Sequence, residues 1–294
     1  MKSGLVAIVG RPNTGKSTLF NRLVGQKISI VSRHPATTRL RLTGIVTTNQ
    51  GQIIFLDTPG FEKPRYQLGQ VMRKAVLSSL SESDITLLLM TVAGWKQGDE
   101  EILAEVKKQK KKSILIINKV DLLASKGALL PLIEESRHRY PFAEIFPCSA
   151  LKETNWKKLI EIIFGLLPEG PLLFPEGEVS GLPRQYLVAE ILREKILAVT
   201  YEEVPQSVAV EIEEICPGQV NPEMLVIRAA IIVDREGLRP IIIGQGASKL
   251  KKIGTKARLE IEQLVGRPVY LDLRVRVIPR WRDRPDVFGR FGYA

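Results

Sequence analysis

The stretch GRPNTGKST, residues 10–18, directly follows an apolar run typical of a strand and opens a run with helical periodicity. It satisfies the phosphate-loop pattern G-x-x-x-x-G-K-[ST] in the context that this pattern requires. Gly10 and Gly15 let backbone N–H groups converge on phosphate oxygens at the start of a helix. Lys16 then reaches the outer phosphates, and the Ser17 hydroxyl is a ligand for Mg²⁺. The pattern does not by itself separate a GTPase from an ATPase or a small-molecule kinase.

A second motif, DTPG at residues 57–60, ends the strand-like run QIIFL. Asp57 is placed to hold Mg²⁺ through water, and Gly60 is placed to offer its backbone N–H to a terminal phosphate. Such tetrapeptides are also common turns. The functional interpretation therefore depends on the phosphate loop that precedes this motif in the chain.

Between these two motifs lies ATTR, residues 36–39. A threonine in this segment is expected to complete the Mg²⁺ shell when the terminal phosphate is present. The choice lies between Thr37 and Thr38, and we assign Thr38. A polar loop without a metal role is the alternative.

The tetrapeptide NKVD, residues 118–121, indicates which base is bound. Guanine presents N1–H and N2–H₂ donors that a carboxylate such as Asp121 accepts, whereas adenine lacks these donors. Lys119 can lie along the base, and Asn118 can tie loops together. The pair Ser-Ala at 149–150 follows a strand-like run and can donate a backbone N–H to the guanine oxygen; an ordinary loop is the alternative. Four elements in this order predict a guanine-nucleotide site.

The predicted nucleotide site is assembled from these elements. Its catalytic residues are Lys16, Thr38 and Gly60, and its Mg²⁺ ligands are Ser17, Thr38 and Asp57. The predicted contacts with GTP are Gly10, Arg11, Pro12, Asn13, Thr14, Gly15, Lys16, Ser17, Thr18, Asp57, Thr58, Pro59, Gly60, Asn118, Lys119, Asp121, Ser149, Ala150 and Leu151.

The pattern along the chain predicts two domains. The first half alternates short apolar runs with helical patterns, as a parallel sheet covered on both faces requires. Residues 169–183 concentrate prolines and glycines among few periodic positions, which indicates an interdomain linker. The second half has the order helix, strand, strand, helical region, strand. The predicted fold class is an α/β, doubly wound P-loop domain followed by an α+β domain.

Composition restricts the class of protein. The 294 residues are 44% hydrophobic and 26% charged, as in soluble globular proteins. The formal charge of +11 favours an anionic partner, with nucleic acid first and a membrane surface second. Cys148 and Cys216 lack companions at metal-binding spacing, which argues against a disulfide framework or zinc site and indicates a reducing compartment. We expect neither a membrane span nor an export signal.

The motifs GRPNTGKST, TTRLR, DTPGF, NKVD and SAL together resemble the Era-type GTPases of the TrmE–Era group. The resemblance implies a Ras-like GTPase domain over residues 1–168, with two switch loops that respond to the terminal phosphate. It implies GTP or GDP and Mg²⁺ as cofactors. Phe61 stands where Ras-like proteins place a water-orienting glutamine, so slow intrinsic turnover is expected. Asn13 matches an asparagine that helps to hold K⁺ in related proteins, so K⁺ is a candidate substitute for an arginine finger.

Era-like proteins carry a C-terminal KH domain of the second type, and residues 184–294 resemble one in the order of their elements. The run GQGASKLKKIG, residues 244–254, corresponds to the G-x-x-G loop that clamps the backbone of about four nucleotides. Ala247 stands where the second glycine belongs, and a positive φ there would cost about 1 kcal/mol. A solvated helix start is the alternative.

Positive charge is concentrated near the end of the chain. Residues 239–294 contain 13 Lys and Arg against 5 Asp and Glu, a surplus of 8. The predicted tail RVRVIPRWRDRP, residues 274–285, mixes arginines with Trp281, a combination that pairs with phosphates and stacks on splayed bases. The alternative is a solvated basic face with Trp281 packed on the domain. The predicted RNA contacts are Gly244, Gln245, Gly246, Ala247, Ser248, Lys249, Lys251, Lys252, Arg276, Arg280, Trp281 and Arg282.

The resemblance also implies a biological role. The expected RNA is the 3′ end of 16S ribosomal RNA, and the expected process is assembly of the 30S subunit, with nucleotide state coupled to RNA binding. A different P-loop ATPase or kinase and an RNA-binding module with a vestigial nucleotide site are the rivals. We expect a monomer in the cytoplasm, with weak peripheral association with the inner membrane.

Overall fold

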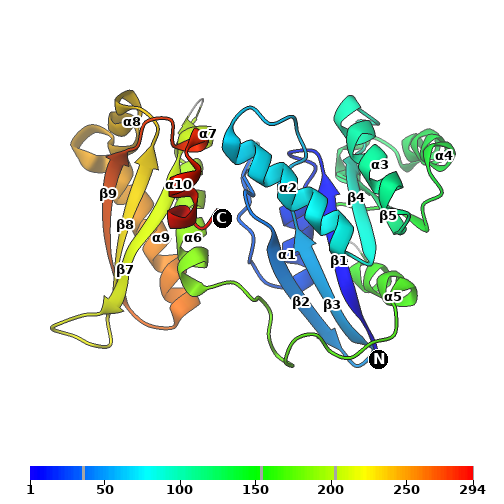
Figure 1. Cartoon of the computed structure of the whole chain (residues 1–294), viewed down its shortest axis with the longest axis horizontal. Coiled ribbons are helices and arrows are strands. Elements are labelled where there is room, and N and C mark those ends of the chain that lie inside the picture. Colours follow the sequence, from blue (N-terminus) through cyan, green and yellow to red (C-terminus); the bar gives the residue numbers. More distant parts are fainter. Residues whose placement is uncertain (35–36, 153–154, 202–203, 294) are drawn as a thin grey trace. The chain divides into compact units, whose positions relative to one another are not determined.

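The computed structural model describes residues 1–34, 37–152, 155–201 and 204–293. These residues form two compact units, each with its own hydrophobic core (Figure 1). The first unit comprises Met1–Ser29, Ala36–Lys63 and Met72–Gly181. The second comprises Leu182–Ala294 together with Ile30–Pro35 and Pro64–Val71.

The first unit is built on a six-stranded sheet in the order β2-β3-β1-β4-β5-β6. Its strands are β1 Lys2–Gly10, β2 Leu42–Thr48, β3 Gly51–Asp57, β4 Ile85–Thr91, β5 Lys112–Asn118 and β6 Glu144–Pro147. Neighbouring strands are parallel except β2 and β3, which are antiparallel. Because β1 lies between β3 and β4, the strand order reverses at β1. In such sheets the ligand binds beyond the carboxyl ends of the strands at this reversal, which is where residues 10–18 begin.

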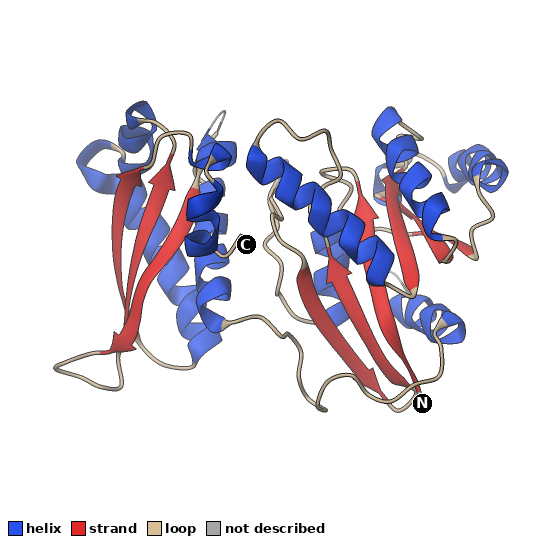
Figure 2. Ribbon diagram, viewed as in Figure 1, coloured by secondary structure: helices blue, strands red, loops and turns tan. Residues whose placement is uncertain are grey.

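Helices cover both faces of this sheet (Figure 2). They are α1 Lys16–Val24, α2 Gln67–Glu82, α3 Gln97–Gln109, α4 Leu129–Arg139 and α5 Trp156–Leu166, with 3₁₀ turns η1 Val120–Leu122 and η2 Lys126–Ala128. Val76, Ile102 and Leu132 from α2, α3 and α4 join one buried cluster with strand residues such as Val9 and Leu88. Strands β3, β4 and β5 are buried along almost their whole length, which explains their near-continuous apolar sequences.

The segment predicted as a linker runs along the first unit for most of its length. Gln52 holds it through its side chain, because Oε1 accepts hydrogen bonds from the backbone N–H groups of Leu173 and Phe174, both at 2.9 Å. Val179 accepts a backbone hydrogen bond from Ile45 N at 2.9 Å. The contact boundary between the units falls after Gly181.

The second unit contains a three-stranded sheet in the order β7-β8-β9. Its strands are β7 Ala209–Pro217, β8 Leu225–Val233 and β9 Val269–Val277. The β7–β8 pair is antiparallel and the β8–β9 pair is parallel. A bulge between Ile212 and Glu214 adds one residue to β7. The parallel pair requires a crossover, and the helical region between β8 and β9 provides it.

The remaining elements of the second unit are helices and 3₁₀ turns. They are α6 Arg184–Leu197, α7 Val204–Ser207, η3 Glu236–Leu238, α8 Arg239–Ile243, η4 Gln245–Ala247, α9 Ser248–Val265, η5 Trp281–Asp283, α10 Pro285–Phe288 and η6 Gly289–Phe291. Leu192 of α6 and Ile253 of α9 pack in one core with the inward-facing residues of the sheet, such as Ile227. No helix in the described ranges is both long and apolar enough to cross a membrane.

The C-terminal segment is folded onto the second unit rather than extended as a basic tail. Trp281, Phe288, Phe291 and Tyr293 are all buried. The indole of Trp281 meets Phe291 edge-to-face at 5.5 Å between ring centroids, and its Nε1–H donates to the carbonyl of Ser207 at 2.8 Å. The interleaved apolar and basic pattern after β9 is thus the pattern of a half-buried segment.

Candidate nucleotide site and nucleic-acid interface

The phosphate loop leaves β1 at Gly10 and enters α1 at Lys16. Gly15 has φ +99°, and a Cβ there would lie 2.2 Å from Nδ2 of Asn118. Asn13 also has a positive φ, of 62°. A Cβ on Gly10 would lie 2.6 Å from the carbonyl oxygen of Leu89. Gly15 is therefore required by its backbone conformation and by close approach, and Gly10 by close approach.

Lys16 lies folded into the phosphate loop. Its Nζ donates to the backbone carbonyls of Gly10 and Arg11, at 3.0 and 2.9 Å. Burial lowers the pKa of Lys16 to about 8, while the charge of Asp57 acts in the opposite direction. Arg11 is ion-paired with the buried carboxylate of Asp99 on α3, at 2.8 Å, which anchors the loop.

The predicted metal ligands lie together in the first unit. The hydroxyls of Ser17 and Thr38, two of the predicted Mg²⁺ ligands, are 2.7 Å apart. Asp57 is buried, and one of its oxygens accepts a hydrogen bond from the Ser29 hydroxyl at 2.8 Å. Its other oxygen, Oδ1, has no hydrogen-bond partner among the described residues. Burial raises the pKa of Asp57 to about 6, against the nearby charge of Lys16.

This donor set fits Mg²⁺. The ion prefers hard oxygen ligands and keeps several waters, so it needs only a few hydroxyl and carboxylate oxygens from the protein. A divalent cation would also satisfy the buried Oδ1 of Asp57 and favour the ionised carboxylate. Ser29 is a residue that sequence reasoning missed, because nothing in the pattern links position 29 to position 57.

Asn118 joins three loops at the base end of the site. Its Nδ2–H donates to the carbonyl of Thr14 at 2.8 Å, and its Oδ1 accepts from the backbone N–H of Ala150 at 2.9 Å. The Lys119 backbone has φ +66°, and η1, which contains Asp121, begins directly after it. The side chain of one residue thus brings the predicted phosphate, base and Ser-Ala loops together.

The DTPG loop lies against the phosphate loop. A Cβ on Gly60 would lie 2.7 Å from Cγ of Pro12, and the next backbone N–H, that of Phe61, donates to the Gly10 carbonyl at 3.1 Å. The Phe61 ring is buried in the cluster with Val76 and lies under the Arg73 guanidinium at 4.7 Å. Phe61 is therefore a core residue, and its side chain is committed to packing.

The glycine-rich turn of the second unit has an unusual backbone. Gly244, Gly246 and Ala247 have φ values of +71°, +56° and +61°. Ala247 thus adopts the left-handed conformation that a glycine would adopt more easily. The turn leads into α9 at Ser248, where Lys249, Lys251 and Lys252 are exposed. These side chains, together with the helix N-terminus, present positive charge to solvent.

Comparison with known proteins agrees with both sites. A family described as 50S ribosome-binding GTPase matches residues 5–119, and the KH domain family matches residues 203–282. The chain is 50% identical to GTPase Era of Aquifex aeolicus over 300 aligned positions, which cover 100% of both chains. It is 45% identical to GTPase Era of Carboxydothermus hydrogenoformans, covering 100% of this chain and 98% of that one.

The chain belongs to the Era family of GTPases.

Solved Era structures share its fold throughout. A crystal structure of a point variant of Aquifex aeolicus Era bound to GDP·AlF₄⁻ matches with a TM-score of 0.97 at 50% identity, covering 100% of both chains. A structure of Era in complex with MgGDPNP and nucleotides 1506–1542 of 16S ribosomal RNA matches with a TM-score of 0.97 at 49% identity, covering 100% of this chain and 99% of that one. The predicted P-loop GTPase and KH folds are confirmed.

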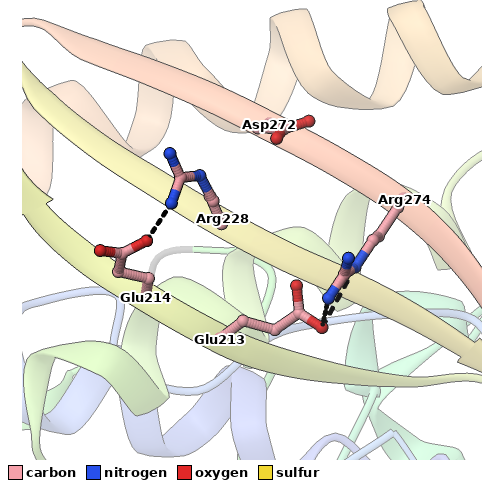
Figure 3. A pocket seen from close by; sticks show the side chains of 5 residues that line it. All are labelled: Glu213, Glu214, Arg228, Asp272 and Arg274. Atoms are coloured by element: carbon pink, nitrogen blue, oxygen red, sulfur yellow. Dashed lines mark hydrogen bonds and ion pairs between the residues drawn. The ribbon is translucent and has the colours of Figure 1, made fainter.

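Three arginines on the sheet of this Era-family KH domain are paired with glutamates of β7. The bulge in β7 brings both Glu213 and Glu214 to the same face of the sheet, and Figure 3 shows Glu213 joined to Arg274 and Glu214 joined to Arg228. Arg276, a predicted RNA contact, donates to Glu213 Oε1 at 3.1 Å. Any phosphate that approaches Arg276 would therefore compete with a carboxylate already in place.

Trp281 corrects a prediction. Its side chain is 0% exposed, so it cannot stack on a splayed base in this structure. The reason is that its indole supplies apolar area and a hydrogen-bond donor to the C-terminal cluster. The Arg282 guanidinium, another predicted RNA contact, already has partners within the protein. It forms an ion pair with Asp234 at 2.7 Å and lies over the Tyr66 ring at 3.9 Å from the centroid. Arg280 remains exposed, with φ +50°.

Proposed function

We propose that this protein binds and hydrolyses GTP and uses its KH domain to hold the 3′ end of 16S ribosomal RNA during assembly of the 30S subunit. The observation that carries the nucleotide part is the Asn118 side chain, which joins the Thr14 and Ala150 loops. Support for the RNA part comes from the positive-φ turn at residues 244–247 and from the homologous Era bound to MgGDPNP and 16S ribosomal RNA nucleotides.

The residues of the site divide the chemistry among them. Lys16 and the backbone N–H of Gly60 are placed to stabilise charge on the outer phosphates. Ser17, Thr38 and Asp57 would hold Mg²⁺, which neutralises charge on the phosphate oxygens when bound. Because the Phe61 side chain is packed in the core, it does not orient the attacking water. We therefore expect slow hydrolysis in the absence of an activator.

We also propose that K⁺ assists hydrolysis through Asn13, which lies within the phosphate loop and has a positive φ of 62°. Turnover measured at equal ionic strength in KCl and NaCl tests this role. Faster hydrolysis in KCl that is lost in Asn13→Ala is the expected result. Equal rates of GTP hydrolysis in KCl and NaCl would show that K⁺ has no specific role.

Base selection is tested by Asp121→Asn. An amide cannot accept both guanine donors, so GTP affinity should fall roughly 10- to 100-fold. Xanthosine triphosphate carries a carbonyl where guanine has its exocyclic amine, so its affinity should rise. Competition binding with the two nucleotides provides the measurement. A variant that keeps the preference for GTP would show that Asp121 does not read the base.

RNA binding is tested by reversing Lys249, Lys251 and Lys252 to glutamate. Binding of a short 16S 3′-end oligonucleotide should weaken, and the slope of log affinity against log salt should fall by roughly 2 because about three phosphate contacts are lost. Basal GTP hydrolysis should be unchanged, whereas stimulation by the oligonucleotide should disappear. Wild-type affinity and salt slope would identify this stretch as a solvated helix start.

We further propose that the protein is a cytoplasmic monomer with weak peripheral association with the inner membrane. Support for membrane association is limited to the net charge of +11, which attracts anionic lipid surfaces. Co-sedimentation with anionic and with neutral vesicles tests the association. Light scattering at several concentrations tests the monomer.

A further inference from the structure

A buried serine lies behind the carboxylate that is predicted to bind Mg²⁺. The Ser29 hydroxyl donates to Oδ2 of Asp57 at 2.8 Å. Ser29 is 1% exposed and Asp57 is 0% exposed, so no bulk water competes for this hydrogen bond. Oδ1 of Asp57 has no hydrogen-bond partner among the described residues. The two carboxylate oxygens are therefore not equivalent, because the protein fixes one of them and leaves the other to a cation.

The segment that carries Ser29 is fixed by one side chain of α1. Oδ1 of Asn21 accepts the backbone N–H groups of Ile28 and Ser29, at 3.0 and 2.9 Å. Nδ2 of Asn21 donates to the carbonyl of Ser29 at 2.7 Å. One amide thus holds both backbone groups of the serine. Because Asn21 and Ser17 belong to the same helix, this amide ties Ser29 to an element that carries a predicted Mg²⁺ ligand.

A neutral hydrogen-bond donor has an advantage beside a metal-binding carboxylate. A lysine or arginine on Oδ2 would also fix the carboxylate, but its positive charge would oppose the binding of a divalent cation. The hydroxyl of Ser29 fixes Asp57 and adds no charge. Groups that hold metal ligands in place through hydrogen bonds are important for affinity, and their loss typically weakens metal binding.

Other buried serines of the first unit use their hydroxyls differently. Ser79, which is 0% exposed, donates to the carbonyl of Ala75, one turn earlier in α2, at 2.7 Å. Ser136 donates in the same way to Leu132 of α4, also at 2.7 Å. Each of these bonds satisfies a hydroxyl within its own helix. Ser29 instead donates to a residue 28 positions away in the sequence, at the predicted metal site.

We propose that Ser29 is a positioning residue for Mg²⁺, held in place by Asn21, and that it keeps Oδ1 of Asp57 available to the ion or to its bound water. This inference rests on the proposed function and adds two residues that lie outside the nucleotide motifs. Asn21 and Ser29 act through Asp57. Their loss should therefore lower the affinity for Mg²⁺ and leave the affinity for the metal-free nucleotide unchanged.

The test measures Mg²⁺ affinity separately from nucleotide affinity in the full-length protein. Binding of a fluorescent GDP analogue in EDTA gives the metal-free nucleotide affinity. Mg²⁺ is then titrated, and the concentration that gives half of its effect on release of the analogue is recorded. Ser29→Ala should raise this Mg²⁺ concentration roughly 10- to 100-fold. The affinity for the analogue in EDTA should stay within about twofold of the wild-type value.

Three further variants sharpen the comparison. Ser79→Ala removes a buried hydroxyl of the same unit and should leave both affinities within about twofold of wild type. Asn21→Ala should raise the half-effect Mg²⁺ concentration alone, but add little when combined with Ser29→Ala, because its effect passes through the serine hydroxyl. Ser29→Cys fills the same position with a weak donor and should also raise the Mg²⁺ concentration, so the test does not depend on the folding of one variant.

The outcomes separate this inference from the proposed function. If Mg²⁺ does not alter release of the analogue from the wild-type protein, the predicted metal site is itself wrong. If Mg²⁺ acts on the wild type and the half-effect concentration is unchanged in Ser29→Ala, the serine has no positioning role. Equal increases in Ser29→Ala and Ser79→Ala, or an equal loss of affinity in EDTA, would also overturn the proposal. Additive effects of Asn21→Ala and Ser29→Ala would show that Asn21 does not act through the serine.

Discussion

At Gly15 the phosphate loop combines two constraints that no other residue type meets. Its φ of +99° is open to glycine, and the space where a Cβ would lie is occupied by Nδ2 of Asn118 at 2.2 Å. Gly25 ends α1 with a similar φ of +77°, but nothing lies within 4 Å of its Cβ position. Substitutions at these two glycines therefore distinguish the effect of backbone strain, which both share, from the effect of steric exclusion, which only Gly15 has.

Gly25→Ala should lower the free energy of unfolding by about 1 kcal/mol, through backbone strain alone, and leave nucleotide affinity unchanged. Gly15→Ala carries the same strain and must also displace Asn118, which loosens the joint between the phosphate and base loops. We expect more than a tenfold loss of GDP affinity in Gly15→Ala, or about 1.4 kcal/mol. Calorimetric titration of both variants measures the difference. Equal GDP affinities would mean that Asn118 does not depend on this contact.

The turn between α8 and α9 is the element that carries the RNA prediction. Ala247 lies at φ +61°, directly before the helix, whereas Ala257 lies within α9 and is fully buried. The same Ala→Gly change therefore acts with opposite sign at the two positions. At one position glycine relieves strain, and at the other it removes a buried methyl group and weakens a helix.

Ala247→Gly should leave the free energy of unfolding unchanged or raise it by up to about 1 kcal/mol, since relief of strain is partly offset by a more flexible unfolded chain. Ala257→Gly should lower it by roughly 1 kcal/mol or more. Urea unfolding of the two variants measures both effects. A comparable destabilisation at position 247 would contradict the left-handed backbone, and a loss of RNA affinity there would show that the alanine methyl group contributes to binding.

On the scale of the whole molecule, the chain forms two units with separate cores, and the C-terminal segment packs onto the second one. The buried Trp281 packs against Phe291 and donates a hydrogen bond to the Ser207 carbonyl, so it joins segments that are far apart in the sequence. The first unit carries the nucleotide site without any residue of that segment. Substitutions in the C-terminal cluster should therefore weaken RNA binding and leave nucleotide affinity unchanged.

Trp281→Ala should destabilise the second unit by roughly 3–5 kcal/mol, while GDP affinity stays at the wild-type value. Trp281→Phe keeps most of the apolar area but removes the indole N–H that donates to the Ser207 carbonyl, so a smaller loss of about 1–3 kcal/mol is expected. Thermal unfolding with and without GDP distinguishes the units, because ligand raises only the transition of the unit that binds it. A fall in GDP affinity would show that the two cores are not independent.

The nucleotide site was predictable because its parts are short and local. Each loop follows a strand, and the order of the strands alone brings their carboxyl ends to one edge of a parallel sheet. Gly15, Lys16, Asn118 and Asp121 could therefore be assigned from motifs of four to nine residues. The correspondence of residues 244–247 to a G-x-x-G loop could likewise be assigned from a local motif.

Only the tertiary structure decided which polar and aromatic side chains are available. The pattern of charges predicts that Arg276 faces RNA, but its guanidinium is held by Glu213, which lies 63 positions away in the chain. The same applies to the burial of Trp281 and to the hydrogen bond between Ser29 and Asp57. Composition and periodicity depend only on residues that are close together in the sequence. Ion pairing and burial depend on neighbours in space, which are known only once the strands and helices have packed.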